Sequence, residues 1–143
     1  MKNLTTRMMI AAAALVAAAS VASAQTMEAN VPFAFRADGR VLAAGTYRVQ
    51  VLRTESGNVL VAISGLNKDR LVFTTSMADG QAKDAWKSAD KPMLSFRCGV
   101  SRCALTDVWI GGDTPQYRVP APSLGKDEPV RTAEIAMHTV KGD

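Results

Sequence analysis

From residue 25 onward, the chain consists of short apolar or alternating runs, each closed by turn residues, and this spacing constrains the fold most. Tyr47, Val49 and Val51 alternate with Arg48 and Gln50, which is the pattern of a strand with one buried face. Such runs recur about every ten residues, and no long amphipathic helix is available to connect parallel strands. The pattern predicts an all-β fold, an antiparallel β-sandwich or small barrel of about 7–8 short strands.

Other runs of the same kind predict further strands, at 31–35, 59–63, 71–75, 93–98, 103–110 and 116–119. Two segments are ambiguous. Residues 77–91 are polar and lack β-branched side chains, which favours a loop with a helical turn around Ala82–Trp86. Residues 130–140 fit a last strand with one apolar face, and a helix fits only slightly less well. That face would carry Ala133, Ile135 and Met137.

The first 24 residues have the three-part pattern of a cleavable secretory signal peptide. Lys2 and Arg7 form a positive start, residues 8–19 are continuously apolar, and Ala22-Ser23-Ala24 fits the A-x-A cleavage rule. The alternative is a membrane anchor, but the apolar stretch is at the short edge of the roughly 20 residues that span a bilayer. No cluster of basic residues follows it to stop transfer.

Cleavage between Ala24 and Gln25 would leave one β domain, residues 25–143, with no membrane span. We expect this domain to be secreted or periplasmic. The precursor has a net charge of +4, and loss of two basic residues leaves 15 basic against 13 acidic residues, a net charge of +2. So small a charge over a whole domain gives no argument for a nucleic-acid partner.

The two cysteines, Cys98 and Cys103, flank four residues that fit a hairpin loop. In that register the two cysteines stand opposite each other, and Phe96 stands opposite Leu105 on the same face. Directly opposed side chains are close enough for a disulfide, and an exported protein is where a disulfide persists. We therefore predict a disulfide that closes the hairpin, and not a redox pair, whose usual spacing is C-x-x-C.

A constellation of residues for catalysis is not apparent, so we expect no enzyme, no cofactor and no metal site. His138 is the only histidine and lies near the chain end. Asp107 and Asp113 are the nearest to a carboxylate pair. By alternation Asp107 shares a face with Trp109 and Leu105, and an aspartate partly buried beside a tryptophan could act as a general acid. The plainer interpretation is an aspartate paired with an arginine. The tryptophans, Trp86 and Trp109, are candidates for a binding groove, although Trp109 is expected to fill core.

Several short motifs resemble the opening and centre of a family of small exported proteins of soil bacteria such as acidobacteria, which read V-P-F-x-F, a short gap, then L-P-A-G-x-Y. The matching residues here are Asn30-Val31-Pro32-Phe33-Ala34-Phe35, Gly39, Leu42, Ala44-Gly45-Thr46-Tyr47-Arg48-Val49, Leu94-Ser95-Phe96 and Leu105-Thr106-Asp107-Val108-Trp109. Ala43 stands where that family has proline. The resemblance implies an exported, compact β domain and carries no activity or site with it.

The sequence thus favours a non-catalytic β domain of the cell envelope or extracellular space, a binding or structural module for an unidentified protein, surface or small molecule. Two alternatives stay open. One is a small barrel that binds an apolar ligand, and the other is a hydrolase whose site has no recognisable pattern.

Overall fold

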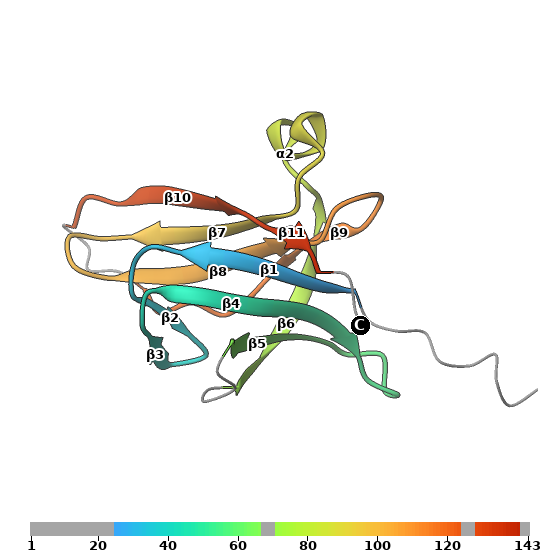
Figure 1. The fold of residues 1–143 in the computed structure, drawn as a ribbon, viewed down its shortest axis with the longest axis horizontal. Helices are drawn as coiled ribbons and strands as arrows, with labels where there is room; N and C mark the ends of the chain where they lie inside the picture. Colours follow the sequence, from blue (N-terminus) through green and yellow to red (C-terminus); the bar gives the residue numbers. More distant parts are fainter. Residues whose placement is uncertain (1–24, 67–70, 124–127, 141–143) are drawn as a thin grey trace, which may run out of the picture.

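Alternation of apolar and polar side chains places most of the chain in strands (Figure 1). The computed structural model describes residues 25–66, 71–123 and 128–140; the expected signal peptide, residues 1–24, including Ala24 at its cleavage site, lies outside them. Within those ranges the all-β prediction is confirmed, but there are eleven strands where about 7–8 were predicted, together with one short helix. They are β1 (Thr26–Val31), β2 (Phe35–Ala37), β3 (Arg40–Leu42), β4 (Gly45–Arg53), β5 (Val59–Gly65), β6 (Leu71–Gln81), α2 (Asp84–Ala89), β7 (Met93–Cys98), β8 (Cys103–Trp109), β9 (Pro115–Arg118), β10 (Arg131–Ala136) and β11 (His138–Thr139).

The strands form one continuous path of neighbours in the order β10-β7-β8-β9-β6-β5-β4-β1-β11, and each pair along it is antiparallel. A side branch adds β2, which pairs with β3 and also runs parallel to the start of β8. That parallel pair was not expected from the sequence. Helix α2 is the only helix in the described ranges, and it is too short to cross a membrane.

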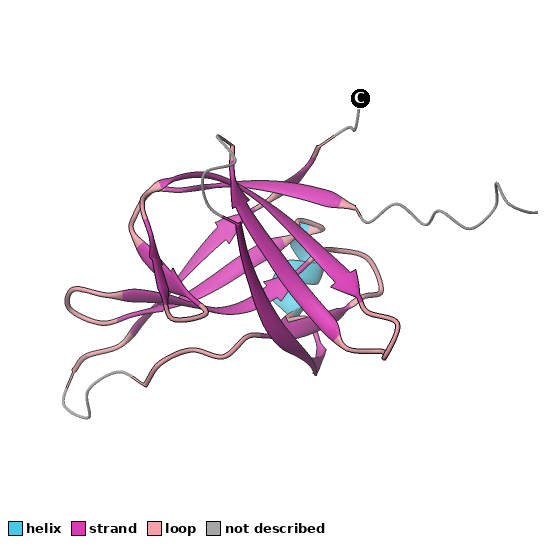
Figure 2. Cartoon of the chain, turned by 90° about the horizontal axis from the view of Figure 1, so that it is seen from below, coloured by secondary structure: helices cyan, strands magenta, loops and turns pink. Residues whose placement is uncertain are grey.

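The two layers are joined at both margins, by β6 at one and by the successive strands β10 and β11 at the other, so the fold combines features of a sandwich and of a barrel (Figure 2). The first half of β6 pairs with β5, and its second half pairs with β9 after a bend. A register shift between Ala78 and Gln81, with Gly80 at a φ of 71°, marks an irregularity in the second half. At the other margin, Met137 separates β10, which pairs with β7, from β11, which pairs with β1.

The hydrophobic core fills the space between the layers. It is formed by the buried side chains of Met27, Ala29, Val31, Phe35, Ala37, Leu42, Tyr47, Val49, Val61, Ile63, Val72, Leu94, Phe96, Cys98, Leu105, Val108, Val119 and Met137. Its centre is aromatic: Phe96 meets Phe33 and Phe35 edge-on at centroid distances of 5.1 and 5.2 Å. These contacts attach the segment after β1 to β7 in the other layer.

The prediction of one strand over residues 31–35 was wrong, because β1 ends at Val31 and β2 begins at Phe35. Pro32 has no N–H to give to a neighbouring strand, and the chain crosses between layers at this point. The predicted face is nevertheless kept, since Val31 and Phe35 are buried in the core and Phe33 packs against it.

The segment from residue 77 to 91 was also only partly predicted. Five of its residues, 77–81, continue β6, because β9 supplies a pairing partner for Met77 and Ala78 despite their polar surroundings. The helical turn expected around Ala82–Trp86 lies slightly later, as α2. For residues 130–140 the strand alternative is confirmed: Met137 is part of the core, and Ala133 and Ile135 pack against it.

The cysteine hairpin is confirmed in detail. Cys98 and Cys103 are directly opposed and joined by a disulfide, with their Cα atoms 4.0 Å apart. Phe96 stands opposite Leu105, and the Gly99 N–H donates to the carbonyl of Arg102 at 2.7 Å to close the loop. Because the closed loop is short, the disulfide is expected to contribute only about 2 kcal/mol to the free energy of unfolding.

Candidate functional site

The outer face of the layer formed by β10, β7, β8, β9 and the end of β6 carries a groove of about 630 Å³. Its floor is made by side chains of β7 and β8: Ser95, Arg97, Thr106 and Asp107. Lys83, just before α2, lies on one side, and the segment from Arg118 to Ala121 lies on another. The groove therefore has a sheet floor, with walls from the residue that precedes a short helix and from a loop.

A β-bulge in β8 explains why two successive side chains reach this floor. Ser95 pairs with Asp107 and Phe96 pairs with Leu105, which leaves Thr106 as the extra residue. Leu105 and Val108 remain in the core, whereas Thr106 and Asp107 between them line the groove. The prediction that alternation puts Asp107 on the face of Leu105 was therefore wrong, because a bulge shifts the period by one residue.

Asp107 is held by the neighbouring strand β9. Its Oδ1 accepts a hydrogen bond from Gln116 Nε2 at 2.9 Å and lies 3.8 Å from Arg118 Nε. Arg118 is also paired with Asp79 through its Nη2, at 2.6 Å. Asp107 thus takes the plainer of its two expected roles, an aspartate paired with an arginine. Asp113 is not brought to it, because Asp113 lines a different pocket of about 510 Å³.

The two tryptophans attach α2 to the outer face of the sheet and do not line the groove. Trp86 stacks on Trp109 with ring centroids 6.5 Å apart, and both side chains are buried. Trp86 Nε1 donates to Glu134 Oε2 at 3.0 Å, while Lys83 Nζ lies 3.2 Å from Glu134 Oε1. Trp109 is buried as expected, but in a small separate cluster with Ala82 and Trp86, outside the main core. This cluster holds α2 on the sheet and so positions Lys83, which precedes the helix, beside the groove.

The cations of the groove differ in how they are compensated. Lys83 and Arg118 both have carboxylate partners, Glu134 for the first and Asp79 and Asp107 for the second. Arg97, exposed on β7, has no ion pair or side-chain hydrogen bond with any residue that the structure describes. The groove therefore presents one uncompensated guanidinium group on its floor.

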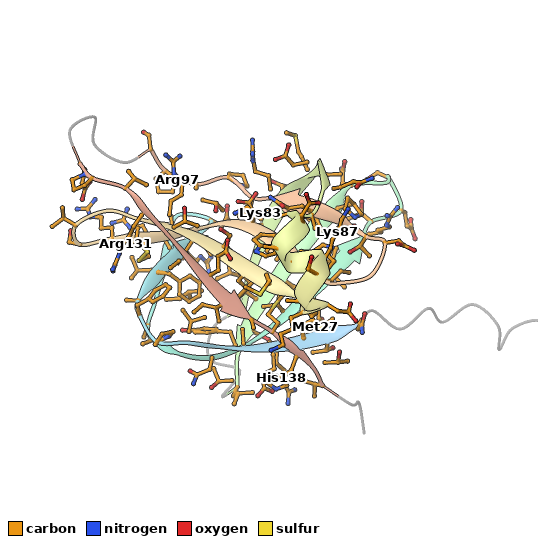
Figure 3. All side chains as sticks on the ribbon, turned by 90° about the horizontal axis from the view of Figure 1, so that it is seen from above. Met27, Lys83, Lys87, Arg97, Arg131 and His138 are labelled. Atoms are coloured by element: carbon orange, nitrogen blue, oxygen red, sulfur yellow. A yellow bond between two sulfur atoms is a disulfide. The ribbon has the colours of Figure 1, made fainter. Side chains whose placement is uncertain are left out.

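His138 lies on the opposite side of the molecule from Arg97 and Lys83 (Figure 3). Its Nε2 is 3.7 Å from Glu28 Oε1, and its side chain is exposed. Both cysteines are in the disulfide, so neither is a free thiol. Within the described ranges, no group of three or more His, Cys, Asp or Glu side chains is placed to hold a metal ion.

Comparison of this chain with family models, with curated proteins and with solved structures finds no match. The site must therefore be judged on its geometry alone. Sequence reasoning singled out Asp107 but missed Lys83, Arg97 and Arg118. The sequence feature that could have indicated this site is the alternation of polar Ser95 and Arg97 with apolar neighbours on β7. It shows that the two side chains share the outer face of the sheet, but not that this face forms a groove.

Proposed function

We propose that this chain is an exported, non-catalytic binding module whose ligand occupies the groove on the outer face of β7 and β8. The observation that carries the proposal is the groove itself, with Arg97 uncompensated on its floor. Ligand sites are typically concave, with a few placed polar groups on a pre-formed scaffold. The paired state of Asp107 and the position of His138 away from the groove give no nucleophile with an adjacent base there.

Export is supported by two independent features. The signal pattern of residues 1–24 is one, and the Cys98–Cys103 disulfide, typical of oxidising compartments, is the other. The alternative of an apolar ligand inside a small barrel has less support. Core side chains such as Phe96 and Val108 occupy the space between the layers, where such a ligand would have to bind. The groove on the outside is the better-formed site.

Expression of the full precursor in a bacterium is expected to yield a processed protein in the periplasm or medium that begins at Gln25, as measured by intact mass. Ala24→Arg is expected to block processing, because the peptidase pocket takes only small residues at that position. Ser23→Leu is the matched control, since the middle position of A-x-A is tolerant. An unprocessed wild-type chain retained in the cytoplasm would contradict export.

Ligand binding is expected to perturb the backbone amide signals of Ser95, Arg97 and Thr106 in nuclear magnetic resonance titrations of residues 25–143. The probes would be a panel of defined neutral and acidic sugars, organic acids and short peptides. Ala121→Trp, which fills the groove from its exposed loop wall, should weaken binding at least ~10-fold. Ala44→Trp, an exposed loop alanine outside the groove, should leave it unchanged. Binding that Ala121→Trp does not affect, or turnover of a bound probe, would refute the proposal.

A further inference from the structure

Strand pairing places two arginines in one row across the outer face. Ala104 of β8 stands opposite Arg97 of β7 in one ladder and opposite Arg36 of β2 in the other. Adjacent strands lie 4.7–4.9 Å apart, so the Cα atoms of Arg36 and Arg97 are separated by about 10 Å. Thr132 of β10, opposite Arg97, extends the same row.

Both arginine side chains leave the outer face of the sheet. On β2, Phe35 and Ala37 on either side of Arg36 are buried in the core, and on β7 the same holds for the two neighbours of Arg97. Because side chains alternate between faces along a strand, Arg36 and Arg97 point away from the core. Ala104, which lies between them in the row, is buried, so the row is covered at that position.

The two arginines line adjoining pockets. Arg97 lies in the groove, and Arg36 lies in a pocket of about 250 Å³ that Arg102 and Ala104 also line. The loop that follows β9 borders both pockets, since residues 120–121 line the groove and residues 122–123 line the smaller pocket. The two pockets therefore share this loop as a wall, and an extended ligand that spans the loop would contact both arginines.

Among the residues that the structure describes, the positive charge of this row is only partly compensated. Like Arg97, Arg36 has no ion pair or side-chain hydrogen bond within the described part of the chain. The carboxylate that faces the smaller pocket is that of Glu128, and its Oε1 accepts a hydrogen bond from the Val100 N–H at 2.7 Å. Glu128 is thus engaged by the disulfide hairpin loop, and Arg36, Arg97 and Arg102 leave an excess of positive charge.

We propose that the ligand is an acidic oligosaccharide, held through two oxyanion groups by Arg97 in the groove and by Arg36 with Arg102 in the adjoining pocket. This inference rests on the proposed function and names the class of ligand. A guanidinium group binds carboxylate or sulfate through two parallel hydrogen bonds, which suits a repeating anion. Hydroxyl groups of Ser101 and Thr132 lie beside the arginines and match the hydroxyls of a sugar.

An acidic peptide fits this surface less well. Peptides that bind sheets usually add a strand to a free edge, where backbone groups can pair. The groove instead crosses the face of strands β7, β8 and β9, each of which is paired on both sides. A peptide backbone lying across the face would find no ladder to join, whereas a sugar chain needs only side-chain donors and acceptors.

The test is isothermal titration calorimetry of residues 25–143, disulfide intact, at low salt, with four probes: trigalacturonate, galacturonate, the uncharged trisaccharide of galactose, and triglutamate. We expect trigalacturonate to bind at least ~10-fold more tightly than each of the other three. The comparison with galacturonate separates an oligomer that uses both positions from a single free anion. Equal binding of the monomer or tighter binding of triglutamate would overturn the assignment.

Variants separate this inference from the proposed function. Arg97→Gln and Arg36→Gln should each weaken trigalacturonate binding at least ~10-fold, and Arg53→Gln, an exposed arginine at the end of β4, should not. Arg97→Lys should recover only part of the loss, because lysine keeps the charge without the two-pronged donor. If a neutral probe binds, is blocked by Ala121→Trp and ignores both arginine variants, the oxyanion inference fails while the groove remains the binding site. If no probe binding is blocked by Ala121→Trp, both fail.

Discussion

Replacing Phe96 with alanine is expected to lower the free energy of unfolding by about 3–5 kcal/mol, measured by chemical denaturation of residues 25–143. Phe96 is fully buried, and its ring makes edge contacts with Phe33 and Phe35. Alanine leaves a cavity at the point where the crossover after β1 meets β7, and the rigid disulfide hairpin that follows limits how far the site can collapse.

Two controls define that result. Phe96→Leu keeps most of the volume and should cost clearly less than the alanine substitution. Val100→Ala removes an apolar side chain that is 77% exposed in the hairpin loop and should change the free energy of unfolding by no more than ~0.5 kcal/mol. A loss below about 1 kcal/mol for Phe96→Ala would mean that the aromatic cluster does not join the two layers.

Trp86→Ala is expected to cost about 3 kcal/mol and to release α2 from the sheet. Trp86 is the one buried side chain of this helix, so its removal eliminates the stacking on Trp109 and the hydrogen bond to Glu134. A helix of six residues is not stable alone, and its amides should lose protection in hydrogen exchange. The groove would lose the wall that carries Lys83.

Two further variants of α2 separate the contribution of ring packing from that of the hydrogen bond to Glu134. Trp86→Phe keeps a ring against Trp109 but lacks the N–H donor to Glu134, so its cost should be about 1–2 kcal/mol, the value of a hydrogen bond to a charged group together with imperfect packing. Ser88→Ala, at an exposed position of the same helix, should leave protection unchanged. Unaltered exchange in Trp86→Ala would show that α2 is held by some other contact.

Sequence reasoning succeeded where a local pattern determines structure. The alternation through Tyr47 and the cysteine spacing each predict their element, because strand periodicity and hairpin register act over a few residues. Sequence reasoning failed where the secondary structure of a segment depends on pairing with a strand that is distant in the sequence. Met77 belongs to β6 only because β9 lies beside it, and the bulge at Thr106 has no composition signal. The groove could not be predicted, since it needs α2, β7 and the segment after β9 to meet in space.

The candidate site was predicted less well than the fold for a related reason. Asp107 was a candidate because it is a carboxylate close in sequence to a tryptophan. An exposed arginine on a strand, such as Arg97, is common on any protein surface and so was not a candidate. Only the register that aligns it with Ala104 and Arg36 distinguishes this arginine from others. A single sequence does not contain that information in a readable form.

The pairing of β11 with β1 brings the two ends of the described chain together, since the Val140 N–H donates to the carbonyl of Thr26 at 3.0 Å. If the chain is exported from its N-terminus, as proposed, β1 would leave the channel first, and its pairing with β11 could form only after residues 138–139 have crossed. Contacts so distant in sequence form slowly and late. If export occurs as proposed, this part of the sheet would be completed only on the far side of the membrane.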